Sequence, residues 1–465
     1  GTGAIAVNTL GGAGASASLN GANAIGTLTK FTTTTGFALT NTLGLTVAGP
    51  VTDGASIALT ATGLVLAGTV KAPDVALTAS NGAVTQSGGG ITTGLLSGSS
   101  TGATTLTSAT NAIAQLGAFS SVGGFALTDG QSLTVSGTVS DPVSVTLRTA
   151  ADLTLNSAVS SQTLTTIATG AITEGASGSV VATTLTGTAN SAAFPRATVA
   201  TLADFTTTTG FSLGDTGALS VTGTVTDGAS IALQSSFGMT LSGTIRAPSV
   251  TLVAGMDPSI GGGISQTAGS VTAATLSGSS GGVATLTSAG NAIATLGSFT
   301  STGGFALTDG TTLSVTGPVT DTASIGLTVT GGLSLAGTLT APTLTTTVSG
   351  AITQPSGSVQ VTTLTGSAGS ASFVQVANKV TTLDAFASKA GFALTDAAPL
   401  TVVGAVTGTG ITILDDGLTF GPAGSLVAPG GTVQLAALSS AGLTVGGGSG
   451  ITGASPITAA TLVLG

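Results

Sequence analysis

Short runs of alternating apolar and small polar residues recur along the whole chain. Typical runs are Leu45-Thr46-Val47 and 56–59, in which every second residue is apolar. This period of two predicts β-strands with one buried face. Gly, Asp-Gly, Ser-Gly and Ala-Pro separate the runs, and these residues favour turns. No stretch has the 3.6-residue period of an amphipathic helix, so we expect an all-β protein.

A long repeat is superimposed on the strand pattern. The phrase Gly-Phe-Ala-Leu-Thr, or its Phe-Ser-Leu variant, recurs with spacings of 88, 86, 94 and 87 residues, and a second Phe precedes each copy by six residues. The later Phe of each pair, the anchor Phe, is Phe37, Phe125, Phe211, Phe305 and Phe392. The chain therefore contains about five super-repeats of about 88 residues. Their approximate bounds are 1–36, 37–124, 125–210, 211–304, 305–391 and 392–465.

A shorter period lies inside the super-repeat. Segments starting at Leu45 and Leu64 match at 19 residues, and Leu133 matches Leu153 at 20. Sub-repeats of this length suit one turn of a parallel β-solenoid, in which strands stack about 4.8 Å apart. We expect four turns of about 20–22 residues per super-repeat, one of them enlarged around the Phe pair. Three turns of about 29 residues are the alternative, because about nine strands divide evenly by three.

Other all-β architectures fit the composition less well. A propeller usually carries Trp or Tyr in each blade, and this chain has neither. Tandem immunoglobulin-like domains would each need a bulky core and a linker, whereas Gly and Thr run evenly through the repeat and only 3% of residues are aromatic. We therefore expect a single continuous solenoid over residues 1–465. Both ends lie in repeat-like sequence without an evident polar cap, including 1–6 and 462–465, so we expect a portion of a longer chain.

Three phrases make the chain similar to filamentous-haemagglutinin-type exoproteins of two-partner secretion. They are Leu-Thr-Val-x-Gly-Thr-Val, the run from Ala351 to Gln354, and the run from Ala284 to Ile293. The resemblance is one of repeat style and covers nearly the whole chain. It implies a right-handed parallel β-helix, secretion across a bacterial outer membrane, and a role in adhesion or surface structure. The amino-terminal secretion domain of that family is not evident here.

Charge is scarce and dispersed. Only 5% of residues are charged, with seven basic residues against 16 acidic ones. Nucleic-acid binding needs clustered Lys and Arg, so we expect no nucleic-acid partner. Gly, Ser and Thr interrupt every apolar run, so we expect no membrane insertion of this segment.

Reactive residue types are nearly absent. With no His and no Cys, the usual nucleophile–base pairs and zinc sites cannot form. We therefore expect no catalytic residue, no metal site, no cofactor and no enzyme. The adjacent carboxylates Asp415 and Asp416 are the one catalytic candidate weighed, and their Leu-Asp-Asp-Gly context predicts a solvated turn.

Recurring polar residues are also expected to be structural. One aspartate series follows Val-Thr or Val-Ser, and a second follows Leu-Thr and predicts turns. The first comprises Asp53, Asp141, Asp227 and Asp321, and the second comprises Asp129, Asp309 and Asp396. If the first series stacks in one column, its members lie four turns, or about 20 Å, apart, which is too far to share a calcium ion. An Asn-Ala-Ile series is expected to satisfy turn backbone groups, and its members are Asn23, Asn111 and Asn291.

Three further features of the sequence bear on ligand binding. The paired Phe residues are expected to fill the core rather than form a ligand stripe. The glycine runs at 88–90 and 261–263 lack the Lys-Ser/Thr of a phosphate-binding loop. The threonine runs at 32–35 and 206–209 could suggest an ice-binding ladder, but they occur in only two super-repeats.

Two functional hypotheses remain from the sequence. One is the non-enzymatic, rod-like shaft of a large bacterial adhesin or surface fibre, for which the partner is a cell-surface or host receptor. The other is a subunit of an extracellular filament, sheath or surface layer, for which the partner is another copy of the chain. Both place the protein outside the cell.

Overall fold

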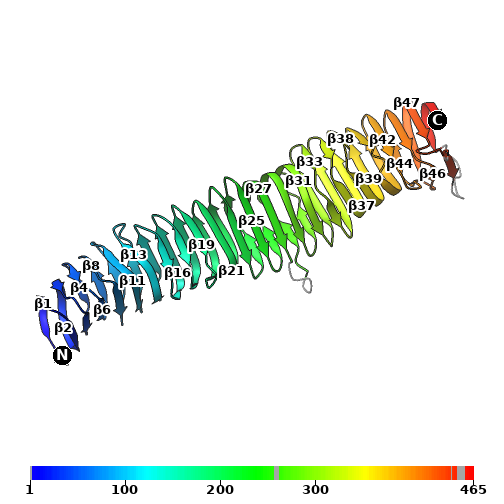
Figure 1. Ribbon diagram of the computed structural model, residues 1–465. Coiled ribbons are helices and arrows are strands. Elements are labelled where there is room, and N and C mark those ends of the chain that lie inside the picture. The colour runs from blue at the N-terminus through cyan, green and yellow to red at the C-terminus, as the bar shows by residue number, and fades with distance from the viewer. Residues whose placement is uncertain (1–2, 256–260, 441, 448–455) are drawn as a thin grey trace. The chain divides into compact units, whose positions relative to one another are not determined.

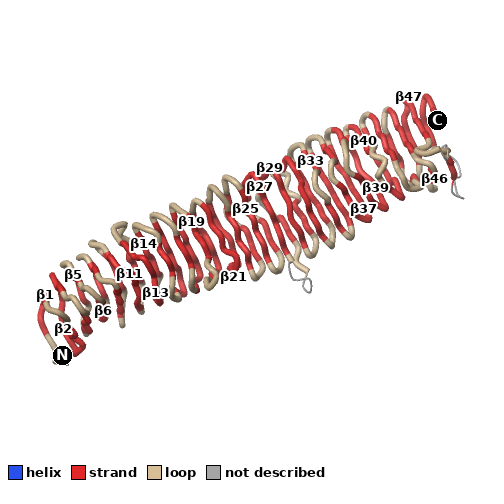
Figure 2. Tube along the Cα trace, viewed as in Figure 1, coloured by secondary structure: helices blue, strands red, loops and turns tan. Residues whose placement is uncertain are grey.

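The protein is all-β in a computed structural model that describes residues 3–255, 261–440, 442–447 and 456–465. Every regular element in these ranges is a strand, and none is a helix (Figure 2). The described part of the chain thus has no helix long and apolar enough to cross a bilayer. Neighbouring strands pair in parallel and form about 21 turns of a β-solenoid. The predicted class is confirmed, and parallel pairing rules out the immunoglobulin-like alternative, whose sheets are antiparallel.

The chain divides into two compact units, Gly1–Ala229 and Ser230–Gly465. A single continuous solenoid over both units stays a prediction of the sequence, as does its handedness. Gly1 and Thr2, part of the expected uncapped start, lie outside the described residues.

The strands of the first unit follow one another closely and range from two to 16 residues in length (Figure 1). They are β1 (Ala6–Ala13), β2 (Ala17–Thr32), β3 (Phe37–Asn41), β4 (Leu45–Val47), β5 (Val51–Thr52), β6 (Ser56–Ala61), β7 (Leu64–Leu66), β8 (Val70–Lys71), β9 (Asp74–Ala79), β10 (Val84–Gln86), β11 (Ile91–Ser100), β12 (Thr104–Leu106), β13 (Ala112–Ser120), β14 (Phe125–Asp129), β15 (Leu133–Val135), β16 (Val139–Thr149), β17 (Leu153–Leu155), β18 (Ala158–Ala168), β19 (Ala171–Glu174), β20 (Ser179–Thr188), β21 (Ser191–Thr206), β22 (Phe211–Asp215), β23 (Leu219–Val221) and β24 (Thr224–Thr226).

The second unit is built in the same way. Its strands are β25 (Ser230–Ser235), β26 (Met239–Leu241), β27 (Thr244–Ala254), β28 (Ile264–Gln266), β29 (Ser270–Ser280), β30 (Ala284–Leu286), β31 (Ala292–Ser301), β32 (Phe305–Asp309), β33 (Leu313–Val315), β34 (Val319–Asp321), β35 (Ser324–Val329), β36 (Leu333–Leu335), β37 (Thr338–Val348), β38 (Ala351–Thr353), β39 (Ser358–Ala368), β40 (Ser370–Phe373), β41 (Lys379–Ser388), β42 (Gly391–Thr395), β43 (Thr401–Val402), β44 (Ala405–Thr407), β45 (Gly410–Leu414), β46 (Gly417–Phe420), β47 (Ser425–Ala436), β48 (Thr444–Gly447) and β49 (Ile457–Leu464).

Three faces make one turn of the solenoid, each formed by its own strand or by part of a long strand such as β16, which pairs directly with β18 of the next turn. In the first unit β3, β4 and β5 pair with β6, β7 and β8 of the next turn. Leu45 lies opposite Leu64 and Leu133 opposite Leu153, the same residues that the sequence matches at 19 and 20. Within β3 the side chains alternate between buried and half-buried, so the alternating pattern of the sequence builds a narrow apolar core.

Successive super-repeats of the first unit begin on different faces of the solenoid. The column that starts at Phe37 does not contain Phe125; it continues through Ile57, Val75, Leu96, Leu116 and Val135. Phe125 instead lies in the column of the next strand, after Leu45, Leu64, Val84 and Thr104. One super-repeat thus occupies four turns plus one face. The expected whole number of turns is wrong, and equivalent aspartates do not stack in one column.

The second unit repeats this relation. From Phe305 the column runs through Ile325, Leu344, Leu364, Leu383 and Val402. Phe392 lies in the column of the next strand, after Leu313, Leu333, Ile352 and Ala371. The same offset in both units shows that it is a property of the repeat.

A glycine lies beneath the first Phe of each pair. Gly98 is opposite Phe119, and the β11–β13 register shifts between Leu96 and Gly98. A Cβ atom on Gly98 would lie 2.9 Å from the Phe119 ring and 2.0 Å from the Leu77 carbonyl oxygen. The same pairing recurs as Gly12–Phe31, Gly187–Phe205, Gly278–Phe299 and Gly366–Phe386. The ring therefore occupies space that only glycine leaves open.

Candidate functional site

The polar residues singled out by the sequence lie mostly inside the solenoid. They form three recurring sets, which we call the corner aspartates, the strand-end carboxyls and the amide bridges. Each set is placed by the repeat and makes hydrogen bonds between neighbouring turns.

Each corner aspartate lies at a bend between two faces of the solenoid, at the third strand of its super-repeat. Asp141 is 1% exposed, and its Oδ1 accepts the N–H groups of Val143 and Ser144 at 2.8 and 3.0 Å. Its Oδ2 accepts the Gly124 N–H at 2.8 Å and the Ser121 hydroxyl at 2.7 Å, both from the preceding turn. Burial alone would raise the pKa of Asp141, but these hydrogen bonds outweigh it and lower the pKa. Equivalent contacts hold Asp53, Asp227 and Asp321.

The strand-end carboxyls are the set of residues four positions after each anchor Phe, all of them aspartates except the amide Asn41. Asp129 Oδ1 accepts the N–H of Ile113, 16 residues earlier, at 2.9 Å. Its Oδ2 is buried without a hydrogen-bond partner, and burial raises the pKa of Asp129 to about 6. Asp309 and Asp396 accept the equivalent N–H groups of Ile293 and Val380. These residues join two turns, which goes beyond the local turn role that the sequence suggested.

Two members of this set were not identified from the sequence. Asp215 accepts the N–H of Val199 at 2.7 Å, and Asn41 accepts that of Ile25 at 2.8 Å. Their constant position, four residues after Phe211 and Phe37, is the signal that could have identified them. Asn41 also donates to the Ile25 and Leu43 carbonyls, so an amide satisfies this position fully.

The amide bridges join three successive turns. Asn111 Oδ1 accepts the Ile91 N–H at 2.9 Å, and its Nδ2 donates to the Leu106 and Thr128 carbonyl oxygens at 3.2 and 2.9 Å. The Gln86 side chain, one turn earlier, donates to Asn111 Oδ1 at 2.8 Å. Asn291 with Gln266, and Asn378 with Gln354, repeat this arrangement. The expected backbone-satisfying role of Asn23, Asn111 and Asn291 is what the contacts show. Asn378 was missed because Asn-Lys-Val replaces Asn-Ala-Ile, although it too lies 14 residues before its anchor Phe.

One super-repeat departs from the amide pattern. Ala197 occupies the Asn position and Glu174 the Gln position. Glu174 is 4% exposed and accepts the Arg196 N–H at 2.8 Å, while the Arg196 guanidinium donates to the Gly175 carbonyl. Burial raises the pKa of Glu174, against the opposing effect of the Arg196 N–H and charge. A buried acid beside an arginine here takes the place of the amide pair.

The two aspartates of the one catalytic candidate lie in different places: Asp415 is buried in the core, and Asp416 is half-buried. Asp415 is 1% exposed, so the expected solvated turn is wrong for this residue. Its Oδ1 accepts the Gly417 N–H at 2.6 Å, and its Oδ2 is buried without a partner. Asp416 is half-buried and accepts the N–H groups of Leu438 and Ser439, both at 2.8 Å. The two adjacent carboxylates therefore face different surroundings and do not form a pair at one surface.

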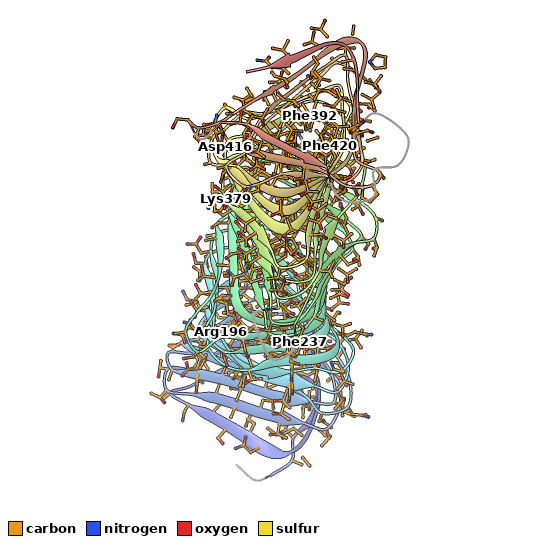
Figure 3. The ribbon with its side chains drawn as sticks, turned by 90° about the vertical axis from the view of Figure 1, so that its right-hand side faces the viewer. Arg196, Phe237, Lys379, Phe392, Asp416 and Phe420 are labelled. Atoms are coloured by element: carbon orange, nitrogen blue, oxygen red, sulfur yellow. The ribbon has the colours of Figure 1, made fainter. Side chains whose placement is uncertain are left out.

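The paired Phe residues fill the core, as expected. Phe119 and Phe125 are each 1% exposed, with ring centroids 5.0 Å apart. Phe392 is likewise buried, whereas Lys379 of the same unit is exposed (Figure 3). The offset rings make contacts of the kind that add stability beyond area burial.

The threonine and glycine runs take part in turns. Thr33 and Thr207 point into the core and are each 3% exposed, so neither run presents an unbroken outward ladder. Gly89 has a φ of +54° and Gly261 a φ of +57°, the left-handed conformation that glycine adopts in turns.

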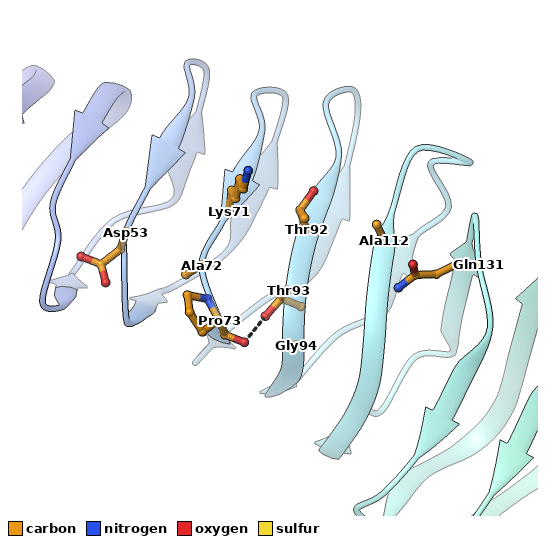
Figure 4. Close-up of a pocket in the computed structure, with 9 residues that line it drawn as sticks. All are labelled: Asp53, Lys71, Ala72, Pro73, Thr92, Thr93, Gly94, Ala112 and Gln131. Atoms are coloured by element: carbon orange, nitrogen blue, oxygen red, sulfur yellow. Dashed lines mark hydrogen bonds between the residues drawn. The ribbon is translucent and has the colours of Figure 1, made fainter.

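A shallow groove of about 400 Å³ lies on the first unit between β8, β11 and β13 (Figure 4). Asp53, Lys71, Thr93 and Gln131 supply its polar side chains. The Asp53 carboxylate is occupied by backbone N–H groups, and the Thr93 hydroxyl is 2.9 Å from the Pro73 carbonyl. Lys71 and Gln131 do not converge on one point (Figure 4).

No group of three or more Asp and Glu residues suited to a metal ion occurs among the described residues. Comparisons with protein-family models, curated proteins and solved structures find no match to this chain.

Proposed function

We propose that this chain is a non-enzymatic segment of an extracellular bacterial adhesin or surface fibre of the filamentous-haemagglutinin type, in which it acts as the shaft. The β-solenoid fold is compatible with such a role. In this proposal the binding activity lies elsewhere in the assembly, and the segment supplies length and mechanical continuity. The proposed location is the bacterial surface.

The observation that carries the proposal is the use of buried polar groups to join turns. Asn111 alone bonds to the turn before it, its own turn and the turn after it. The corner aspartate Asp141 and the strand-end Asp129 each bond backward to the preceding turn. Hydrogen bonds to charged groups are the stronger class, about 1.5–3 kcal/mol each, and this applies to Asp141, whose hydrogen bonds lower its pKa. These contacts give every super-repeat specific links along the direction in which a shaft carries load.

A self-assembling subunit is the second candidate, and low surface charge favours it. The chain has seven basic and 16 acidic residues in 465. Such a surface gives little electrostatic protection against association of copies. Thr198 and Thr216, whose hydroxyls are 2.7 Å apart, illustrate the uncharged polar exterior.

Light scattering and electron microscopy of the purified chain over a concentration series distinguish the two candidates. The shaft proposal predicts single molecules at all concentrations. Ordered filaments or sheets that grow with concentration would replace it with the self-assembly proposal.

A competition assay tests the shaft role itself. The purified chain, added in excess, is expected to leave adhesion of the expressing cells to their target unchanged. Inhibition of adhesion by the chain would show that it carries a receptor site of its own and would overturn the proposal.

A further inference from the structure

Two buried carboxyl groups stack in neighbouring turns near the end of the second unit. Asp396 follows β42 and Asp415 follows β45, and these strands pair with Thr395 opposite Leu414. The Asp396 N–H donates to the Leu414 carbonyl at 2.9 Å, which extends the register by one residue and places the two aspartates opposite each other. Each side chain is only 1% exposed.

The stacked acids distinguish this place from equivalent positions in other super-repeats. Asp129 lies opposite Thr149, and Asp309 lies opposite Val329. At both places the strand-end carboxyl meets an uncharged side chain. Next to Asp396 the neighbouring turn instead supplies a second acid.

Few groups compensate the two charges. Asp396 accepts the N–H groups of Val380 and Ala398 at 3.0 and 3.2 Å, and Asp415 accepts that of Gly417 at 2.6 Å. β46 and β47 carry no charged residue, and β41 carries the exposed Lys379 and, further along, Asp384. The remaining nearby charge is Asp416, which has the same sign.

We propose that Asp396 and Asp415 form a pH-sensitive joint, in which protonation holds the turns from β42 to β47 together and ionisation of both acids loosens them. The physical reason is that two like charges cannot both be ionised cheaply inside the solenoid. Burial is the larger cause and raises the pKa of Asp396 to about 7, with a further rise from the Asp415 charge. Burial also raises the pKa of Asp415.

The direction of the pH effect follows from these shifts. Because the pKa of Asp396 is higher in the folded chain than the ordinary 3.8, the folded state binds more protons than the unfolded state. The stabilisation is complete below the ordinary pKa and is lost as the pH rises through about 7. The joint is therefore closed in acid and weakened in mildly alkaline solution. This inference does not depend on the shaft proposal.

Hydrogen exchange of the whole chain at about pH 5 and about pH 8, corrected for intrinsic exchange, tests the joint. Protection of peptides from residues 391–436 is expected to fall about tenfold or more at the higher pH. Peptides from residues 305–348 of the same unit serve as the internal reference and are expected to keep their protection.

Single substitutions identify the groups responsible. Asp396→Asn is expected to remove the loss of protection, because Asn41 shows that an amide satisfies this position. Asp309→Asn, the matched control at an equivalent position without a stacked acid, is expected to leave the loss unchanged. If Asp396→Asn does not fold, Asp415→Asn decides by the same criterion, since it also leaves one carboxyl. Equal protection of wild-type 391–436 at both pH values, or a loss that persists in the folded variant, would overturn the proposal.

Discussion

At the scale of single residues, the solenoid uses many of its buried polar side chains as links between turns. Asn111 and its equivalents satisfy their own hydrogen-bonding groups while joining three turns. A buried polar group that loses its partner costs about 1–3 kcal/mol, so these hydrogen bonds matter to stability. The loss of one amide bridge should therefore destabilise the turns on both sides of it.

Asn111→Ala should destabilise its own and the adjoining turns by about 3 kcal/mol, because the Ile91 N–H and the Thr128 carbonyl lose their partner. Native-state hydrogen exchange of the Ile91 amide measures the effect. Asn20→Ala is the control, since Asn20 is exposed and its amide donates to the nearby Ser18 hydroxyl rather than to another turn. Equal effects of the two changes would contradict the bridging role.

Two buried aspartates should respond to pH in opposite directions. Asp129 has a pKa of about 6, so its contribution to stability is lost as the pH rises from about 4 through about 6. Asp141 has a lowered pKa, so its contribution is lost as the pH falls below the ordinary 3.8.

We therefore expect Asp129→Asn to stabilise the first unit by about 2–3 kcal/mol at about pH 8 and to change little at about pH 4. Asp141→Asn should destabilise it most at neutral pH. Unfolding midpoints of the two variants against pH provide the check. Parallel pH profiles for both variants would refute the assignment of opposite pKa shifts.

At the scale of the strand, each Phe pair depends on a glycine in the turn before it. The Gly98–Phe119 pairing coincides with a register shift, so the extra residue and the bulky ring are accommodated together. This device recurs at five glycines, one for each Phe pair.

Gly98→Ala should cost about 3 kcal/mol or more, because the new Cβ would lie 2.0 Å from the Leu77 carbonyl oxygen. Gly63→Ala is the matched control, as the nearest atom to its Cβ would be 3.6 Å away. Thermal unfolding followed by circular dichroism compares the two variants. A control as damaging as Gly98→Ala would show that the space beneath Phe119 is not what matters.

Much of this construction was visible in the sequence, because strand alternation and the 19- and 20-residue matches report inward-facing positions directly. Leu45 and Leu64 match because they stack. The rotation of the super-repeat was not predicted, because a repeat length does not report strand pairing: four successive pairings from Phe37 lead to Leu116, nine residues before Phe125. Asp415 was misassigned for a related reason: an Asp-Asp-Gly run predicts an exposed turn, and only the neighbouring turn shows that one of the two acids is covered.

At the scale of the whole molecule, each unit places successive super-repeats one face further around its solenoid. Phe37, Phe125 and Phe211 therefore begin on different faces of the first unit. A surface feature that recurs once per super-repeat then faces several directions. This arrangement suits a shaft that has no preferred side.

The stacking register is the claim on which these arguments rest, and disulfide cross-linking tests it most directly in a chain that has no native Cys. Thr105 and Ala126 are outward-facing partners in adjacent turns, at the start of the second super-repeat. Strand partners lie about 5 Å apart, within reach of a disulfide. The double variant Thr105→Cys/Ala126→Cys is predicted to form an intramolecular disulfide under mild oxidation. Thr105→Cys/Thr134→Cys, the pair that a 29-residue turn would bring together, is predicted to remain reduced, and the reverse result would contradict the fold described.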